Sequence, residues 1–98
     1  MRDIEQLREE IRKTDQEMAA LFQRRMGLVR EVAAYKKERG LQVKDAGQEK
    51  RVLQKNVSLI TDEALKQYYL TFMQDVMNVS CQYQEDLMTA EKDKIPHE

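Results

Sequence analysis

The stretch RRMGLVREVAAYKK, residues 24–37, predicts a helix that carries positive charge on its apolar face. Apolar side chains recur at intervals of three and four residues before, within and after this stretch, which is the spacing of one face of an α-helix. That face comprises Ile4, Leu7, Ile11, Thr14, Met18, Leu21, Arg25, Leu28, Val32 and Tyr35. Basic residues fill the last turn before Gly40, a residue type that favours the end of a helix. The pattern therefore predicts one helix over residues 3–39.

The remainder of the chain predicts two more helices and no strand. Asp45 suits an N-cap, and Gln48 three residues later predicts a capping box. Thr61 is expected to cap the third helix. The helices are expected over residues 3–39, 46–59 and 62–91, followed by a loose tail at 92–98. The sequence thus predicts one all-α domain, residues 1–98, with three helices of which one is very long.

Composition and charge narrow the class of protein. Of the 98 residues, 41% are hydrophobic and 36% charged, and the formal net charge is −1, so no general attraction to nucleic acid or to a membrane is expected. Cys81 has no second cysteine to pair with, and the N-terminal residues lack an apolar signal segment; both features favour the cytoplasm. The sequence has one cysteine, Cys81, and one histidine, His97, which are too few for a typical zinc site, so no metal is expected.

The length of the first helix predicts a dimer. A helix of about 37 residues is about 55 Å long, whereas a compact chain of this size has a radius of gyration of about 13 Å. Two shorter helices cannot cover so long an apolar face, and a second copy of the chain is the simplest cover. A homodimer with paired long helices is therefore expected.

Cations on the first helix predict a site for a small dianion. Burying an arginine without a partner is costly, so Arg25 in the middle of the apolar face needs a carboxylate or an anionic ligand. Lys36 lies about 16 Å further along the helix, so the two long side chains could close on one ligand from both ends. Arg8 lies about 25 Å from Arg25 and could reach that ligand only from the neighbouring chain of an antiparallel pair. Taken alone, Arg8 and Lys36 are more typical of surface charges.

Polar residues of the other two helices extend this predicted site. Ser80 and Gln84 interrupt the apolar face of the third helix one turn apart, although in isolation an interhelical hydrogen bond would explain them. Asp45 and Glu49 flank the start of the second helix, where the helix dipole favours acids in any case. Together these residues indicate a pocket with cations, neutral donors and an acid, but without an evident nucleophile or general base.

Four segments, in this order, resemble the all-helical class of chorismate mutases over essentially the whole chain. They are LREEIRKTD (7–15), the Arg25 segment that ends in VAAYKK (32–37), VKDAGQE (43–49) and SCQYQ (80–84). The resemblance implies an intertwined homodimer that converts chorismate into prephenate in the biosynthesis of phenylalanine and tyrosine. It also implies that the reaction uses no cofactor and no metal.

The resemblance implies a role for each cation and donor. Arg8 would be donated to the site of the partner chain, whereas Arg25 and Lys36 would bind the two carboxylates of chorismate. Lys36 and Gln84 would both donate to the ether oxygen, and Ser80 would contact a carboxylate. The catalytic residues expected on this basis are Arg25, Lys36, Glu49 and Gln84.

The start of the second helix both fits the family and departs from it. Asp45 and Glu49 match residues that lie near the ring hydroxyl group of the substrate. Gln48 is also expected to contact the substrate, but it stands where the family usually has arginine. The site would carry one positive charge fewer, and Lys44 and Arg51 are the nearby cations that could offset this loss.

Two other functions fit parts of the sequence. Relatives of the same fold, with the same paired cations, eliminate pyruvate from isochorismate; Glu49 and the extent of the resemblance favour the mutase. The heptad-like spacing of the first helix would also suit a non-catalytic dimeric adaptor. Such an adaptor gains nothing from Arg25, Ser80 and Gln84 on apolar faces, so an enzyme is the favoured interpretation.

Overall fold

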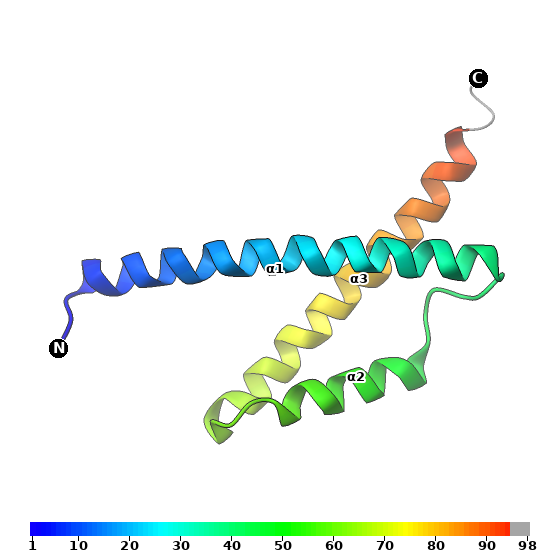
Figure 1. Ribbon diagram of the computed structural model, residues 1–98. Coiled ribbons are helices and arrows are strands. Elements are labelled where there is room, and N and C mark those ends of the chain that lie inside the picture. The colour runs from blue at the N-terminus through cyan, green and yellow to red at the C-terminus, as the bar shows by residue number, and fades with distance from the viewer. Residues whose placement is uncertain (95–98) are drawn as a thin grey trace.

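The computed structural model describes residues 1–94 of the 98-residue chain, which form three α-helices and one short 3₁₀-helix. The elements are α1 (Ile4–Glu38), α2 (Ala46–Ser58), η1 (Glu63–Leu65) and α3 (Lys66–Lys94). α3 packs against both of the other α-helices: it crosses α1, and its first half runs close to α2 (Figure 1). The prediction of an all-α fold with one very long helix is confirmed.

Local capping explains where α1 begins and ends. The carboxylate of Asp3 accepts from the backbone N–H of Gln6 at 2.9 Å, and the Gln6 side chain accepts from the N–H of Asp3 at 3.0 Å. At the other end Gly40 adopts a φ of +66°, a conformation that costs glycine little. The N–H groups of Gly40 and Leu41 then donate to carbonyls of the last turn, which stops the helix.

The capping residues before α2 and α3 differ from the prediction in two details. Asp45 caps α2 by accepting from the N–H of Gln48 at 3.1 Å, as predicted. The predicted capping box is wrong, because the Gln48 side chain accepts from Arg51 and not from the backbone N–H of Asp45. The cap before α3 is Asp62 rather than Thr61, and it accepts from an N–H group of η1. A charged carboxylate is favoured at this positive end of a helix over a neutral hydroxyl.

α3 continues further than the sequence predicts. It extends to Lys94 rather than ending near residue 91, so the expected loose tail is wrong for residues 92–94. Residues 95–98 of that expected tail lie outside the described residues. The physical reason is that no glycine or proline interrupts the chain between the start of α3 and Pro96.

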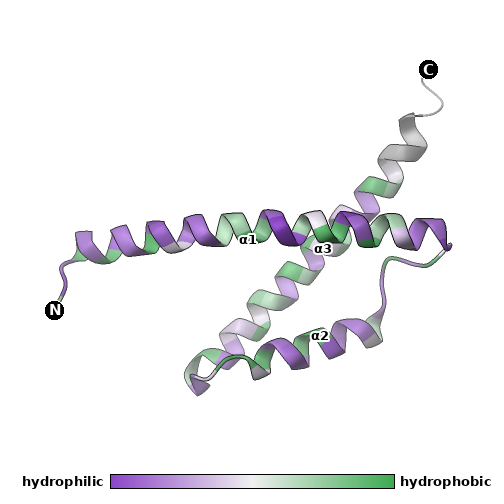
Figure 2. Cartoon of the chain, in the orientation of Figure 1, coloured by the Kyte–Doolittle hydropathy of each residue, from purple (hydrophilic) through white to green (hydrophobic). Residues whose placement is uncertain are grey.

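A small core holds the helices together and leaves much apolar surface exposed. The buried hydrophobic residues are Ala33, Val43, Met73 and Met77. The large apolar side chains that stay exposed include Ile4, Leu7, Ile11, Met18, Leu21 and Phe22. These belong to the N-terminal half of α1, which projects beyond α3 and carries hydrophobic positions along its length (Figure 2). Within residues 1–94, no helix has the length and hydrophobicity of a membrane span.

The exposed area and the radius of gyration both exceed those of a compact monomer. The accessible surface is 8294 Å², whereas a compact monomer of this mass exposes about 5,800 Å². The radius of gyration is 17.6 Å, against about 13 Å for a compact domain of this length. The excess of about 2,500 Å² per chain lies within the range that obligate dimers bury.

Candidate active site

α1, α2, α3 and the connection between α1 and α2 surround a cavity of about 160 Å³. Its polar lining consists of Arg25, Lys36, Asp45, Gln48, Glu49, Ser80, Cys81 and Gln84. Its apolar lining consists of Val29, Val32, Val43, Val52 and Met77. An apolar wall with a few convergent polar groups is typical of a small-molecule site. The cavity brings together every site residue that the sequence predicts, with the exception of Arg8.

Arg25 is hydrogen-bonded in this cavity but its charge is not neutralised. The half-buried guanidinium donates from Nη1 to Ser80 Oγ, and the Ser80 hydroxyl donates in turn to the carbonyl of Val76 at 2.8 Å. Among the described residues, no carboxylate forms an ion pair with Arg25. The positive charge that the sequence places on an apolar face therefore remains available to an anionic ligand.

Lys36 is anchored by the backbone of the α1–α2 connection. Its Nζ atom donates to the carbonyl of Val43 at 2.5 Å, and Val43 itself is buried. Among residues 1–89, whose side chains the structure describes, no carboxylate forms an ion pair with this half-buried ammonium either. An ammonium group has three donors, so two of them remain for a ligand.

Glu49 is one of the two carboxylates in the lining of the cavity, together with Asp45. Its side chain is 18% exposed, and its Oε2 atom lies 3.8 Å from Lys44 Nζ. Its other oxygen, Oε1, accepts a hydrogen bond from Cys81 Sγ at 3.6 Å. The carboxylate is thus held between a residue of the α1–α2 connection and a residue of α3.

Gln48, which stands where the family usually has arginine, is hydrogen-bonded to an arginine one turn further along α2. Gln48 Oε1 accepts from Nε and Nη2 of Arg51, at 3.2 and 3.1 Å. Because a guanidinium only donates, it fixes which end of the amide faces Arg51. The NH₂ group of Gln48 then remains as a neutral donor of this cavity residue. Arg51 itself is not part of the lining.

Gln84 is the most unusual group of the cavity. The residue is only 6% exposed, and its Oε1 atom is buried without a hydrogen-bond partner among the described residues. An unsatisfied buried amide typically costs about 1–3 kcal/mol, and such a cost calls for an explanation. A ligand that carries a hydrogen-bond donor, such as a hydroxyl group, would supply the missing partner.

Comparison with known proteins agrees with this geometry. The sequence profile described as chorismate mutase type II matches residues 7–85. The chain belongs to the chorismate mutase type II family. The match confirms the resemblance seen in the sequence, and it spans every predicted site residue from Arg8 to Gln84. Neither curated proteins nor solved structures gave a match.

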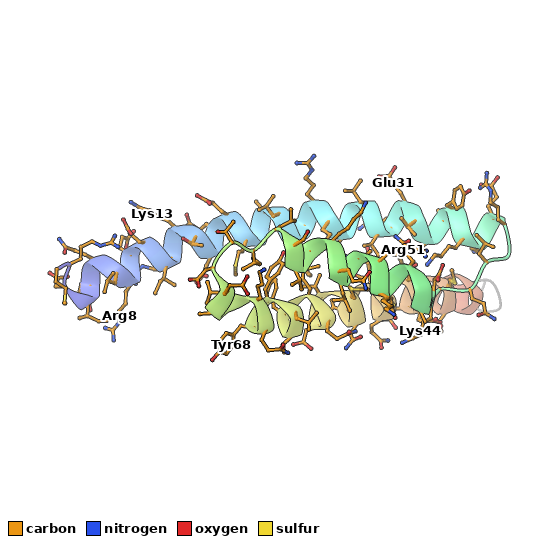
Figure 3. The ribbon with its side chains drawn as sticks, turned by 90° about the horizontal axis from the view of Figure 1, so that it is seen from below. Arg8, Lys13, Glu31, Lys44, Arg51 and Tyr68 are labelled. Atoms are coloured by element: carbon orange, nitrogen blue, oxygen red, sulfur yellow. The ribbon has the colours of Figure 1, made fainter. Side chains whose placement is uncertain are left out.

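Arg8 lies apart from the cavity of this chorismate mutase type II chain. It is exposed, and its Nη1 atom pairs with Glu5 Oε1 at 3.0 Å. Figure 3 shows Arg8 near the free end of α1, with α2 and α3 packed against the other half of the helix. One chain alone does not bring Arg8 to Arg25, as their separation along the helix predicts. Its donation to a partner chain stays a prediction.

Cys81 is the polar lining residue that reasoning from the sequence did not assign to the site. A cysteine carries no marked spacing pattern of its own, so the sequence alone bears only on its disulfide and metal chemistry. The available signal was its position, three residues before Gln84 and directly after Ser80. That spacing places Cys81 on the same face of α3 as Gln84.

Proposed function

We propose that this member of the chorismate mutase type II family catalyses the [3,3] rearrangement of chorismate to prephenate. The observation that carries the proposal is the pair Arg25 and Lys36, two half-buried cations of the cavity lining that have no carboxylate partner within residues 1–89. Chorismate carries two carboxylates on a small framework, so one molecule supplies both missing charges. Membership of the family supports the same substrate.

In this mechanism the site first holds chorismate in a compact conformation. Arg25 and Lys36 bind the two carboxylates, and the valine side chains of the wall pack against the ring and exclude water. The enolpyruvyl side chain is flexible in solution, so fixing it over the ring removes an entropic part of the barrier. Asp45 and Glu49 orient the ring through its hydroxyl group, and Ser80 supports one carboxylate.

The second contribution is charge stabilisation at the ether oxygen. The bond between this oxygen and the ring breaks while the methylene carbon of the side chain bonds to the ring carbon that bears the carboxylate. Negative charge builds on the ether oxygen, where donors from Lys36 and Gln84 stabilise the transition state more than the substrate. The amide of Gln84 suits this task because its NH₂ group is a neutral donor in the lining of the cavity, on a residue that is buried. The rearrangement moves no proton and consumes no cofactor.

We further propose that the active form is an intertwined homodimer in which Arg8 of each chain completes the partner's site. The excess exposed area of about 2,500 Å² per chain supports this assembly, as does the row of exposed apolar residues on the projecting half of α1. Two long helices that run antiparallel would bring Arg8 of one chain close to Arg25 of the other.

The proposed product sets the biological context. Prephenate is a precursor of phenylalanine and tyrosine, so we propose a role in the biosynthesis of these amino acids. A cytoplasmic location remains a prediction from the single cysteine.

A direct assay tests the proposal. Purified protein mixed with chorismate is expected to consume it and to release prephenate, and Arg25→Ala is expected to lose nearly all of this activity while keeping its helical circular dichroism. Isochorismate provides the second arm of the experiment, because elimination of pyruvate from it would yield salicylate. Formation of salicylate without prephenate would identify a lyase, and no turnover of either substrate would contradict an enzymatic role.

A further inference from the structure

The thiol of Cys81 is a polar group of the cavity that has no part in the mechanism proposed above. Its Sγ atom donates to Glu49 Oε1 at 3.6 Å, which lies within reach of the weak hydrogen bond that a thiol forms. Cys81 belongs to α3 and Glu49 to α2. The contact therefore connects the two helices at the wall of the cavity.

Cys81 is the less exposed of the two partners of Glu49. The other partner, Lys44, reaches Oε2 at 3.8 Å from a side chain that is 72% exposed, and a long, exposed lysine side chain does little to fix a carboxylate. Cys81 is half-buried on a helix, and its side chain has one torsion that places the sulfur. The orientation of Glu49 thus depends chiefly on the cysteine.

We propose that Cys81 is a positioning residue that holds the Glu49 carboxylate in the substrate cavity, and that modification of its thiol blocks the site. The identity of the substrate rests on the proposed function, whereas the contact between thiol and carboxylate does not. A second observation indicates a ligand in the same cavity, because the buried amide oxygen of Gln84 lacks a partner within the described residues. A group added to the sulfur would occupy much of a cavity of about 160 Å³.

The surroundings of the thiol control its reactivity. Burial raises the pKa of Cys81, and the hydrogen bond to Glu49 and the negative charge of Glu49 raise it further. Lys44 and Lys36 also face the sulfur and lower the pKa, but they do not outweigh the other causes. Because the thiolate is the reactive form, alkylation should be slow near neutral pH. Removal of the Glu49 charge should make it faster.

Alkylation by iodoacetamide tests the contact without reference to activity. The thiolate displaces iodide, and because the chain has one cysteine, the mass of a single adduct reports Cys81 alone. Glu49→Gln is expected to react roughly three- to tenfold faster than the wild type. Glu31→Gln is the matched control, since Glu31 is exposed on the face of α1 away from α2 (Figure 3), and its rate should be unchanged. Equal rates in Glu49→Gln and the wild type would overturn the proposal.

The same reagent tests the position of the thiol in the substrate site. Prephenate, added in excess, is expected to slow alkylation of the wild-type protein, and the alkylated protein is expected to lose its turnover of chorismate. Alkylated protein with full activity would overturn the second part of the proposal. Should the unmodified protein turn over no chorismate at all, the proposed function fails, while the rates in Glu49→Gln still decide the contact.

Two substitutions of Cys81 separate a positioning role from simple packing. Cys81→Ser keeps a donor toward Glu49, whereas Cys81→Val has a similar volume and no donor. Cys81→Val is expected to lower kcat/KM roughly three- to tenfold, and Cys81→Ser to stay within about twofold of the wild type. Thermal unfolding followed by circular dichroism checks that both remain folded. Equal loss in the two variants would indicate packing and would overturn the positioning role.

Discussion

Replacement of Gln84 by alanine separates catalysis from stability at one residue. Gln84 is 6% exposed, and its Oε1 atom has no partner among the described residues. Alanine removes an unsatisfied acceptor, which relieves about 1–3 kcal/mol, while the loss of buried carbon and the small cavity left behind cost a similar amount. The free energy of unfolding should therefore change by less than about 1 kcal/mol.

The effect on catalysis should be far larger. A donor aimed at the developing charge of a transition state is typically worth about 2.7–4 kcal/mol, so Gln84→Ala should lower kcat about a hundred- to a thousandfold with little change in KM. Steady-state consumption of chorismate measures both constants. Gln82→Ala is the control, because Gln82 is exposed on the same helix and its amide donates to Asp86 at 2.9 Å. Near-normal turnover by Gln84→Ala would refute the assigned role.

Gln84→Glu sharpens the same test through pH. A carboxyl group can donate to the ether oxygen only while it is protonated. Burial at this position disfavours the charged form, so the pKa of the introduced carboxyl group should lie above its ordinary value. Activity should then be present below this pKa and be lost as the pH rises through it, whereas the neutral amide of the wild type should work over a broad range. A pH-independent kcat in Gln84→Glu would show that no donor is needed there.

The remaining predictions concern assembly and charge. The protein should sediment as a dimer at micromolar concentration, because the projecting half of α1 needs cover; a stable folded monomer would contradict this. Arg8→Ala and Arg25→Ala should each nearly abolish turnover of chorismate, whereas mixed dimers of the two should regain about one working site, since one site carries both changes and the other neither. No recovery in verified mixed dimers would place both residues in the site of one chain. Gln48→Arg should improve kcat/KM, chiefly through KM, and most clearly together with Arg51→Gln, because two neighbouring guanidinium groups repel. An unchanged kcat/KM in the double variant would exclude the idea of a missing cation.

The helices follow from the sequence because their signals are local. The apolar spacing of three and four residues, the basic last turn and Gly40 define α1, and the structure places its ends within a residue of the prediction. The capping details were harder because side chains compete for one partner. Gln48 can reach back to the N-cap or forward to Arg51, and the charged donor of Arg51 forms the stronger bond. A pattern of residue types shows which hydrogen-bond partners lie within reach of a side chain, but not which of them it binds.

The cavity follows from the sequence in its cations and donors, but not in all its contacts. Arg25, Ser80 and Gln84 attract notice because they interrupt apolar faces, and the structure does gather them. The contact of Cys81 with Glu49 depends on how α3 lies against α2, and that register is set by the packing of the whole helical faces. A half-buried thiol next to a carboxylate has no distinct local signature, so only the fold reveals it.

Arg8 connects the single chain to the proposed assembly. α1 is one continuous helix from Ile4 to Glu38, so the separation of about 25 Å between Arg8 and Arg25 is fixed by the helix itself, and Arg8 cannot reach its own cavity unless the helix breaks. Its pairing with Glu5 does not hold it in place, since both side chains are more than half exposed and such a pair is worth about 0–1 kcal/mol. The carboxylate of a ligand in a neighbouring, less solvated site would bind the same guanidinium more strongly. The geometry of α1 thus excludes Arg8 from the site of its own chain. Because its pairing with Glu5 is weak, Arg8 can exchange that contact for one in the site of a partner chain.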